Sequence, residues 1–206
     1  GNPIWFADKY NNAEDFIFTQ FLPNGNVVGF GEGSGYETDL NGNIIFETPD
    51  NIGVHHKIYK TAQNTYFLIS GTVQNQYCPE ECNPSLPDQI PWQGDIFREL
   101  DSEGEVIWNW NTFDYIDSTE YNPYYAQTYT GDYEMDWTHS NSVFYDENSQ
   151  SVFVSIRNLS RITKIDYASK EIIWNLGQID YMSEIYFNVD LNFSQQHSVK
   201  VLDNGN

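Results

Sequence analysis

Basic residues are scarce in this chain of 206 residues, and there are only two cysteines and four histidines. Nine Lys and Arg side chains stand against 30 Asp and Glu side chains, which gives a formal net charge of -21. Nucleic acids and anionic lipid surfaces are bound by clustered basic side chains, so we expect neither as a partner. The acidic residues are dispersed along the chain, which is typical of a solvated surface.

Long apolar runs and a sustained helical period are also missing. Apolar residues come in runs of four to six, separated by Asn, Gly, Asp and Ser, and none approaches the roughly 18 residues of a membrane-spanning helix. Hydrophobic residues make up 39% of the chain and aromatic residues 17%, which is enough to bury a core. We therefore expect a globular all-β fold without a membrane span.

The two cysteines, Cys78 and Cys82, lie together in a Pro-rich loop. A structural zinc site needs four ligands and typically uses tighter cysteine pairs, and the chain has no second pair. We therefore expect a local disulfide, no metal and an oxidising compartment.

Three similar segments predict a repeated structural unit. They are YETDLNGNIIF, FRELDSEGEVIW and ITKIDYASKEIIW, at residues 36–46, 97–108 and 162–174. In each segment a strand ends near an Asp, a polar turn follows, and a second strand ends in Ile and a large aromatic residue. The Asp residues are 39, 101 and 166, so the repeat lengths are 62 and 65 residues. The pattern predicts the outer hairpin of each unit.

Further strands are predicted before these hairpins, at residues 26–30, 65–70 and 151–156, and histidine-led strands at 55–59 and 139–143. Four antiparallel strands per unit make the blade of a β-propeller, so we predict one propeller domain over residues 1–206. Its units are expected at 16–48, 54–111, 137–176 and, as the first strand of another blade, 195–206. About three blades cannot close a ring, so we expect the chain to be part of a longer polypeptide; an open stack is the alternative. Residues 74–91 and 112–137 are expected to form long loops.

All four histidines fall at the start of a predicted innermost strand: His55 and His56, His139, and His197. Innermost strands line the channel of a propeller, so the residues that open them converge at one mouth. A single histidine is more often a structural hydrogen-bonding residue. The same position in three units is much harder to explain by packing, so we predict a histidine-lined site.

The stretch 136–174 adds an amide and a guanidinium to this site. His139 and Asn141 are two residues apart, so we expect them to face the same way from one strand. Arg157 ends the next strand, and the turn at 146–150 brings the two strands side by side. An imidazole, an amide and a guanidinium together bind oxyanions. The alternative for Arg157 is a structural ion pair with a carboxylate.

The chain resembles a known family in four motifs: HHxI, DWxHxNSV with Arg157 following 18 residues after His139, EIIWxLG and QHxV. These resemble the bacterial arylsulfate sulfotransferases over nearly the whole chain. The resemblance implies a six-bladed propeller in the periplasm or cell exterior. It also implies sulfuryl transfer from an aryl sulfate to a phenol, with no cofactor. The family's sulfated nucleophile falls on His197, and its channel residues fall on His139, Asn141 and Arg157. An earlier histidine falls in the pair His55 and His56, of which His56 is preferred.

These residue types suit a transfer in two steps. The neutral imidazole of His197 can attack sulfur and hold the sulfuryl group covalently, while Arg157 and Asn141 donate hydrogen bonds to its oxygens. His139 can protonate the leaving phenolate and later deprotonate the acceptor phenol. Trp137 and Tyr125 are candidates to flank the aryl ring, and His55 is a further candidate substrate contact.

Two functions therefore remain. The first is a ping-pong aryl sulfotransferase that works through a sulfohistidine. The alternative is a non-catalytic propeller that serves as an extracellular ligand-binding or protein-interaction module. The presence of all the motif residues favours the enzyme, and an incomplete channel favours the binding module.

Overall fold

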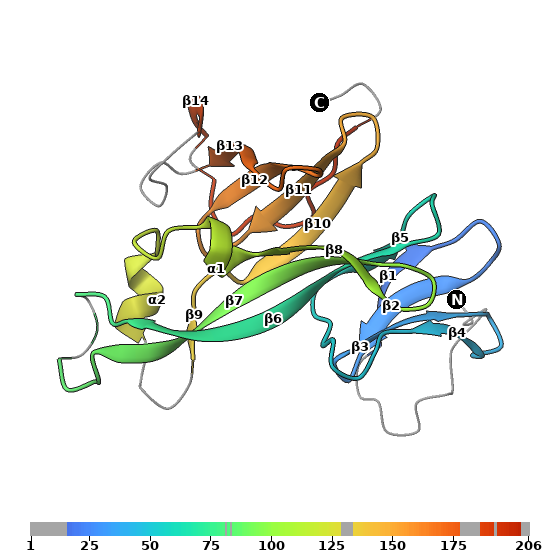
Figure 1. Cartoon of the computed structure of the whole chain (residues 1–206), viewed down its shortest axis with the longest axis horizontal. Coiled ribbons are helices and arrows are strands. Elements are labelled where there is room, and N and C mark those ends of the chain that lie inside the picture. The colour runs from blue at the N-terminus through green and yellow to red at the C-terminus, as the bar shows by residue number, and fades with distance from the viewer. Residues whose placement is uncertain are drawn as a thin grey trace, which may run out of the picture. The chain divides into compact units, whose positions relative to one another are not determined.

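The computed structural model describes residues 16–80, 82, 84–128, 134–177, 186–191 and 193–202, and most of these lie in β-strands (Figure 1). The predicted all-β class is confirmed. The described residues also include two short helices, α1 (Thr112–Tyr115) and α2 (Pro123–Thr128). Among the described residues, no helix has the length and apolar character needed to span a membrane.

The strands form three sheets whose order follows the sequence. The first sheet contains β1 (Ile17–Phe21), β2 (Val27–Gly31), β3 (Ser34–Thr38) and β4 (Ile44–Glu47). The second contains β5 (Ile58–Lys60), β6 (Tyr66–Tyr77), β7 (Gln89–Leu100) and β8 (Val106–Asn111), with β9 (Met135–Asp136) parallel to β7. The third contains β10 (Ser140–Asp146), β11 (Ser151–Ile156), β12 (Arg161–Asp166) and β13 (Ile172–Gly177), with β14 (Tyr186–Asp190) parallel to β13.

Each sheet thus contains the four-stranded series expected of a propeller-like blade. The three predicted outer hairpins are β3–β4, β7–β8 and β12–β13. Ring closure and the number of blades stay predictions, as does a single domain over residues 1–206. Residues 203–206 of the predicted fourth unit lie outside the described part of the chain.

The repeated Asp residues act as the turn residues of the outer hairpins. The Asp39 carboxylate accepts the backbone N–H groups of Asn41 and Asn43, and Asp101 accepts those of Glu103 and Glu105 in the same way. Such side-chain bonds to the following backbone add to the backbone turn, in which the N–H groups of Gly42 and Gly104 donate to the carbonyls of Asp39 and Asp101. Gly42 and Gly104 then take positive φ angles of 80° and 89°, a conformation that suits glycine.

The third hairpin turn is one residue longer than the other two. The N–H of Asp166 bonds to the carbonyl of Glu171, five residues on, whereas that of Asp39 bonds to Asn43, four residues on. Lys170 takes the positive φ of 65° in this turn. The extra residue accounts for the weaker likeness of the third segment to the first two.

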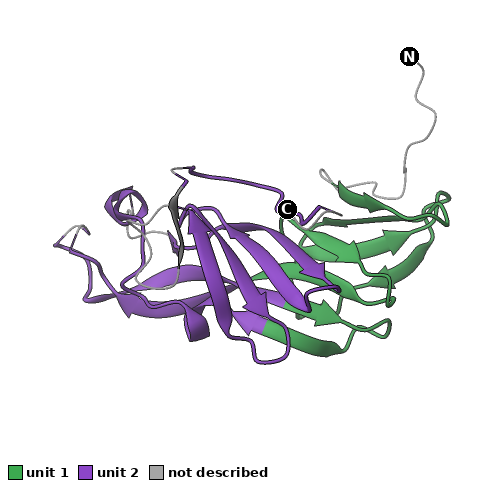
Figure 2. Cartoon of the chain, turned by 90° about the horizontal axis from the view of Figure 1, so that it is seen from above, with its two compact units in different colours: residues 1–70, 98–109 green, residues 71–97, 110–206 purple. Residues whose placement is uncertain are grey.

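The chain divides into two compact units, residues 1–70 with 98–109, and residues 71–97 with 110–206 (Figure 2). In the first unit, buried side chains of the first and second sheets and of the segment between them form one cluster: Val28, Phe46, Ile52, Val54, Ile58, Tyr66, Leu68 and Leu100. Gly35 lies against this cluster, because a Cβ there would come within 2.5 Å of the Ile58 side chain. The second unit holds the buried rings of Trp92, Trp110 and Trp137.

A buried carboxylate holds polar groups together in the first unit. Glu37 is 1% exposed and receives hydrogen bonds from Lys60 Nζ (2.7 Å), Tyr66 Oη (2.5 Å) and Asn26 Nδ2 (2.6 Å). Burial alone would raise the pKa of Glu37, but these hydrogen bonds and the Lys60 charge outweigh it and lower the pKa. Burial, together with the same carboxylate, raises the pKa of Tyr66.

Three local predictions were wrong. The segment 74–91 is only partly a loop, because β6 and β7 extend into it from both sides, and 112–137 contains both helices. The histidines do not open strands, because β5 begins at Ile58 and β10 at Ser140, after His56 and His139. Residues 195–202 form no strand in the part of this segment that the structure describes.

We expect Glu37→Gln to lower the free energy of unfolding near neutral pH by about 1–3 kcal/mol, because it removes the charged partner of Lys60. A carboxylate with a lowered folded pKa stabilises the protein above its unfolded pKa of about 4.3, and this stabilisation is lost as the pH falls through the folded value. Glu37→Gln should therefore lose less stability than the wild type below about pH 5. Urea unfolding at several pH values measures this, with the exposed Glu103→Gln as the control. If the free energies of unfolding of wild type and Glu37→Gln changed in parallel with pH, this prediction would be contradicted.

Candidate active site

His139 lies in a loop immediately before β10. Its φ of 46° is left-handed, and the pairing of β10 with β11 shifts register between Ser140 and Ser142. The two-residue alternation expected for His139 and Asn141 therefore does not hold, because it requires both residues to be in a regular strand. Tertiary contacts fix the loop instead.

Asp95, from β7, is one of these contacts. Its side chain is 3% exposed, and its Oδ2 accepts hydrogen bonds from Thr138 Oγ1 (2.6 Å) and from the backbone N–H of Ser140 (2.7 Å). These two residues flank His139 on both sides. A buried carboxylate thus holds the backbone at the histidine in its left-handed conformation.

Asn158 joins the same loop to the turn that carries Arg157. Its Nδ2 donates to the carbonyl of Asp136 (2.7 Å), and its backbone N–H donates to that of Thr138 (3.1 Å). Its Oδ1 accepts from Arg157 Nη1 at 2.7 Å. One buried residue therefore positions both the histidine loop and the guanidinium.

Arg157 is half-buried and is held by uncharged groups. Nη1 donates to Tyr125 Oη (3.0 Å) as well as to Asn158, and Nη2 lies 3.4 Å from Gln195 Oε1. The ion pairs in the described part of the chain do not include Arg157. Arg161, in the same sheet, is different, because it is 1% exposed and pairs with Glu120. The ion pair considered for Arg157 is thus absent among the described residues.

Residues 195–197 cross the ends of β10 and β11, although they form no strand. The Gln196 carbonyl accepts from Asn141 Nδ2 (2.7 Å) and Ser155 Oγ (3.2 Å). Its side-chain Nε2 reaches Ser155 Oγ and the carbonyls of Ile156 and Arg161, at 3.1, 3.2 and 2.8 Å. Gln196 thereby anchors the segment that carries His197 to the third sheet.

The ring of His197 is exposed, and its orientation is set by its own segment. Nδ1 lies 2.9 Å from the carbonyl of Gln195. A carbonyl only accepts hydrogen bonds, so Nδ1 carries the proton and the lone pair of the neutral ring lies on Nε2. Since the Gln195 side chain contacts Arg157, one residue links the predicted nucleophile to the predicted oxyanion ligand.

Asn141 is 7% exposed, and its Nδ2 already donates to Gln196, so it positions the His197 segment.

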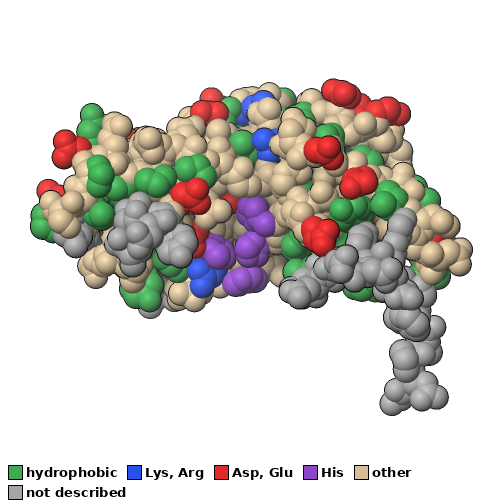
Figure 3. Space-filling model, turned by 90° about the horizontal axis from the view of Figure 1, so that it is seen from below, with side chains coloured by type: hydrophobic (Ala, Val, Ile, Leu, Met, Phe, Trp, Pro, Cys, Tyr) green, Lys and Arg blue, Asp and Glu red, His purple; other side chains and the backbone are tan. Residues whose placement is uncertain are grey.

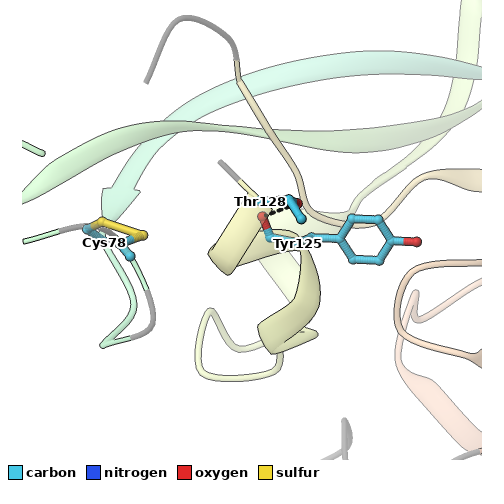
Figure 4. Close-up of a disulfide and its surroundings, with 4 residues drawn as sticks. Cys78, Tyr125 and Thr128 are labelled. Carbon is cyan, nitrogen blue, oxygen red and sulfur yellow. Dashed lines mark hydrogen bonds between the residues drawn. A yellow bond between two sulfur atoms is a disulfide. The ribbon is translucent and has the colours of Figure 1, made fainter. Parts of the chain in front are cut away.

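Tyr125, on α2, places its hydroxyl on Arg157, and its ring points away from the Cys78–Cys82 disulfide (Figure 4). Trp137 is 1% exposed and packs against Trp92 and Phe113, which leaves no open ring face for a substrate.

His55 and His56 lie in the first unit, just before β5. Their Nδ1 atoms are 2.8 Å apart, and His56 has a φ of 58°. Their place at the site with the other histidines stays a prediction.

The predicted disulfide is confirmed. Cys78 and Cys82 are bonded, with their Cα atoms 6.0 Å apart, at the end of β6. Among the described residues, His, Cys, Asp and Glu side chains form no group of three or more that could hold a metal ion.

Comparison with known proteins identifies the family. A family model described as Arylsulfotransferase (ASST) matches residues 1–206. The chain belongs to the arylsulfotransferase family. This is a family of transferases, which supports an enzymatic role. No curated protein matches the chain.

Among solved structures, this chain is similar to a protein of unknown function from Bacteroides caccae. The sequence identity is 12% and the TM-score 0.40, with 81% of this chain covered. The match covers 47% of that chain, so the present chain spans about half the length of that protein.

Four residues of the candidate site had no predicted role: Asp95, Asp136, Asn158 and Gln195. Gln196 belonged to a motif but was given no role. Asn158 directly follows Arg157, and Asp136 opens the motif of His139, so both were within reach of motif reasoning. Asp95 gave no local signal, because it lies more than 40 residues before its partners.

We expect Gln196→Ala to loosen the segment that carries His197. Three side-chain contacts are lost, each worth about 1 kcal/mol, so tryptic cleavage after the exposed Lys200 should be about 10- to 100-fold faster. Gln195→Ala is the matched control, because that side chain makes one hydrogen bond, of 3.4 Å, among the described residues, and it should change the rate much less. Equal cleavage rates in wild type and Gln196→Ala would show that Gln196 does not anchor the segment.

Proposed function

We propose that this chain carries out sulfuryl transfer from an aryl sulfate ester to a phenolic acceptor, by a ping-pong mechanism through a sulfohistidine on His197. The observation that carries the proposal is the arrangement at Gln195. Its carbonyl fixes the His197 ring with Nε2 as the nucleophilic nitrogen, and its side chain contacts Arg157, whose hydrogen-bond partners among the described residues are uncharged. A nucleophile and an anion ligand are thus connected through one residue.

The chemistry of the first half-reaction follows from these groups. Arg157 donates paired hydrogen bonds to two sulfuryl oxygens, which screens their charge from the approaching nucleophile. Nε2 of His197 attacks sulfur, the S–O bond to the phenol breaks, and the sulfuryl group stays on nitrogen. His139 supplies a proton to the departing phenolate oxygen. In the second half-reaction an acceptor phenol loses its proton to His139 and attacks sulfur, and His197 is released.

The acidity of the chain does not prevent anion binding at this site. Acidic side chains are scattered over the face drawn in Figure 3. Exposed charges are screened over about 8 Å at physiological ionic strength, so carboxylates farther than this from the site oppose anion binding only weakly, while the guanidinium of Arg157 acts at contact distance.

The remaining proposals concern the setting of the site. We propose that the three sheets are blades of a six-bladed propeller, as the family resemblance implies, and that His56 reaches the same channel. We also propose a periplasmic or extracellular location, which the Cys78–Cys82 disulfide supports because disulfides persist in oxidising compartments.

The first test of this function is covalent labelling. The full chain is incubated with 4-nitrophenyl sulfate and no acceptor, and its peptides are analysed by mass. We expect one acid-labile sulfuryl adduct on the peptide that contains His197, and none in His197→Asn. Ser194→Ala, in the same exposed segment, is the control and should be labelled like the wild type. A folded protein that forms no adduct and releases no phenol from any aryl sulfate would favour the non-catalytic binding module.

A second test concerns Arg157. Arg157→Ala should lower kcat by about 10²- to 10³-fold, because it removes the charged donors that stabilise the sulfuryl oxygens. Arg157→Lys keeps the charge but loses the paired geometry, so it should be only partly active. Lys200→Gln removes an exposed positive charge from the same region and is the control. Steady-state kinetics measures all three, and an Arg157→Ala variant with wild-type kcat would exclude Arg157 from the reaction.

A further inference from the structure

The carboxylate of Asp136 lies beside the imidazole of His139. Oδ2 of Asp136 is 2.6 Å from Nδ1 of His139, and the two side chains are 35% and 32% exposed. The aspartate is at the end of β9, and the histidine follows in the loop before β10. The pair therefore spans the loop between β9 and β10, which carries His139 of the candidate site.

The backbone on both sides of this pair is fixed. The carbonyl of Asp136 accepts from Asn158, and the next residue, Trp137, donates its N–H to the Gln93 carbonyl at 3.0 Å. After the histidine, Ser140 donates to Asp95. The contact between Asp136 and His139 therefore joins two anchored residues, unlike most ion pairs between mobile surface side chains.

The pair determines which nitrogen of His139 reacts. A carboxylate only accepts hydrogen bonds, so Nδ1 of His139 carries a proton in both the neutral and the charged ring. The proton that is exchanged with substrate is then the one on Nε2. Without the carboxylate, a neutral imidazole can also place its single proton on Nε2, and that tautomer cannot accept a proton there.

We propose that Asp136 is the positioning residue of His139, and that it holds the imidazole in the tautomer whose Nε2 exchanges the phenol proton. This inference rests on the proposed function. In the first half-reaction, the proton on Nε2 passes to the phenolate oxygen as the S–O bond breaks and the bond between sulfur and His197 forms. In the second, the acceptor O–H proton returns to Nε2 as the new S–O bond forms and the bond to His197 breaks.

The kinetic test compares Asp136→Asn with the wild type on a series of aryl sulfates of increasing phenol basicity. A weakly basic phenolate such as 4-nitrophenolate leaves with little need of a proton, whereas a basic phenolate needs the acid. We expect a loss of kcat of about 10- to 100-fold for the most basic leaving groups and a much smaller loss for 4-nitrophenyl sulfate, with KM little changed. Glu147→Gln, an exposed carboxylate in the turn between β10 and β11, is the matched control and should behave like the wild type.

A merely structural role for Asp136 predicts an equal loss with every donor, and that result would overturn the proposal. So would an Asp136→Asn variant that is unchanged with all donors.

A second measurement does not depend on activity. Nitrogen NMR of the ¹⁵N-histidine-labelled full chain should show the neutral His139 with its proton on Nδ1 in the wild type, and a mixture of tautomers in Asp136→Asn. A wild-type His139 with its proton on Nε2 would overturn the proposal. If the wild type transferred no sulfuryl group from any donor, the proposed function would fail. The NMR measurement would then still test whether Asp136 fixes the tautomer of His139.

Discussion

The buried amide of Asn158 connects the two segments on which the candidate site depends. Its Nδ2 donates to the carbonyl of Asp136 in the His139 loop, and its Oδ1 accepts from the Arg157 guanidinium, while the backbone N–H of Asn158 donates to the carbonyl of Thr138. Asn158 is 1% exposed, so moving either segment would leave a buried polar group without a partner, at a cost of about 1–3 kcal/mol. The imidazole and the guanidinium therefore have a common rigid support.

The predicted nucleophile is positioned by a different device. His197 lies on a segment without regular structure, and this segment is joined to the third sheet through Gln196 and to Arg157 through Gln195. The hydrogen-bond partners of Arg157 in the described part of the chain are uncharged, whereas Arg161 pairs with a carboxylate. The two arginines of one sheet are thus divided between anion binding, as we propose, and structural pairing. His139 and His197 both hydrogen-bond through Nδ1, so both present Nε2 to a substrate.

The repeated hairpins could be predicted from the sequence because their signals are local. Asp39 and Asp101 bond to residues two and four positions ahead, and the disulfide also spans four residues. The conformation of His139 could not, because a φ of 46° depends on Asp95, far away in the chain. The two helices are too short for a periodic pattern, although Asn111 as an N-cap was a usable signal. The motifs pointed to the side chains predicted to react. The residues that position those side chains through hydrogen bonds were found only in the structure.

The central claim is that Arg157 and Nε2 of His197 act on one sulfuryl group. A crystal structure of the full chain with an aryl sulfamate, a non-transferable analogue of the donor, tests this most directly. The account predicts that two oxygens of the sulfamate accept hydrogen bonds from Arg157, that its sulfur faces Nε2 of His197, and that Nδ1 stays on the Gln195 carbonyl. An analogue bound away from Arg157, or a His197 ring that turns Nδ1 toward sulfur, would contradict it.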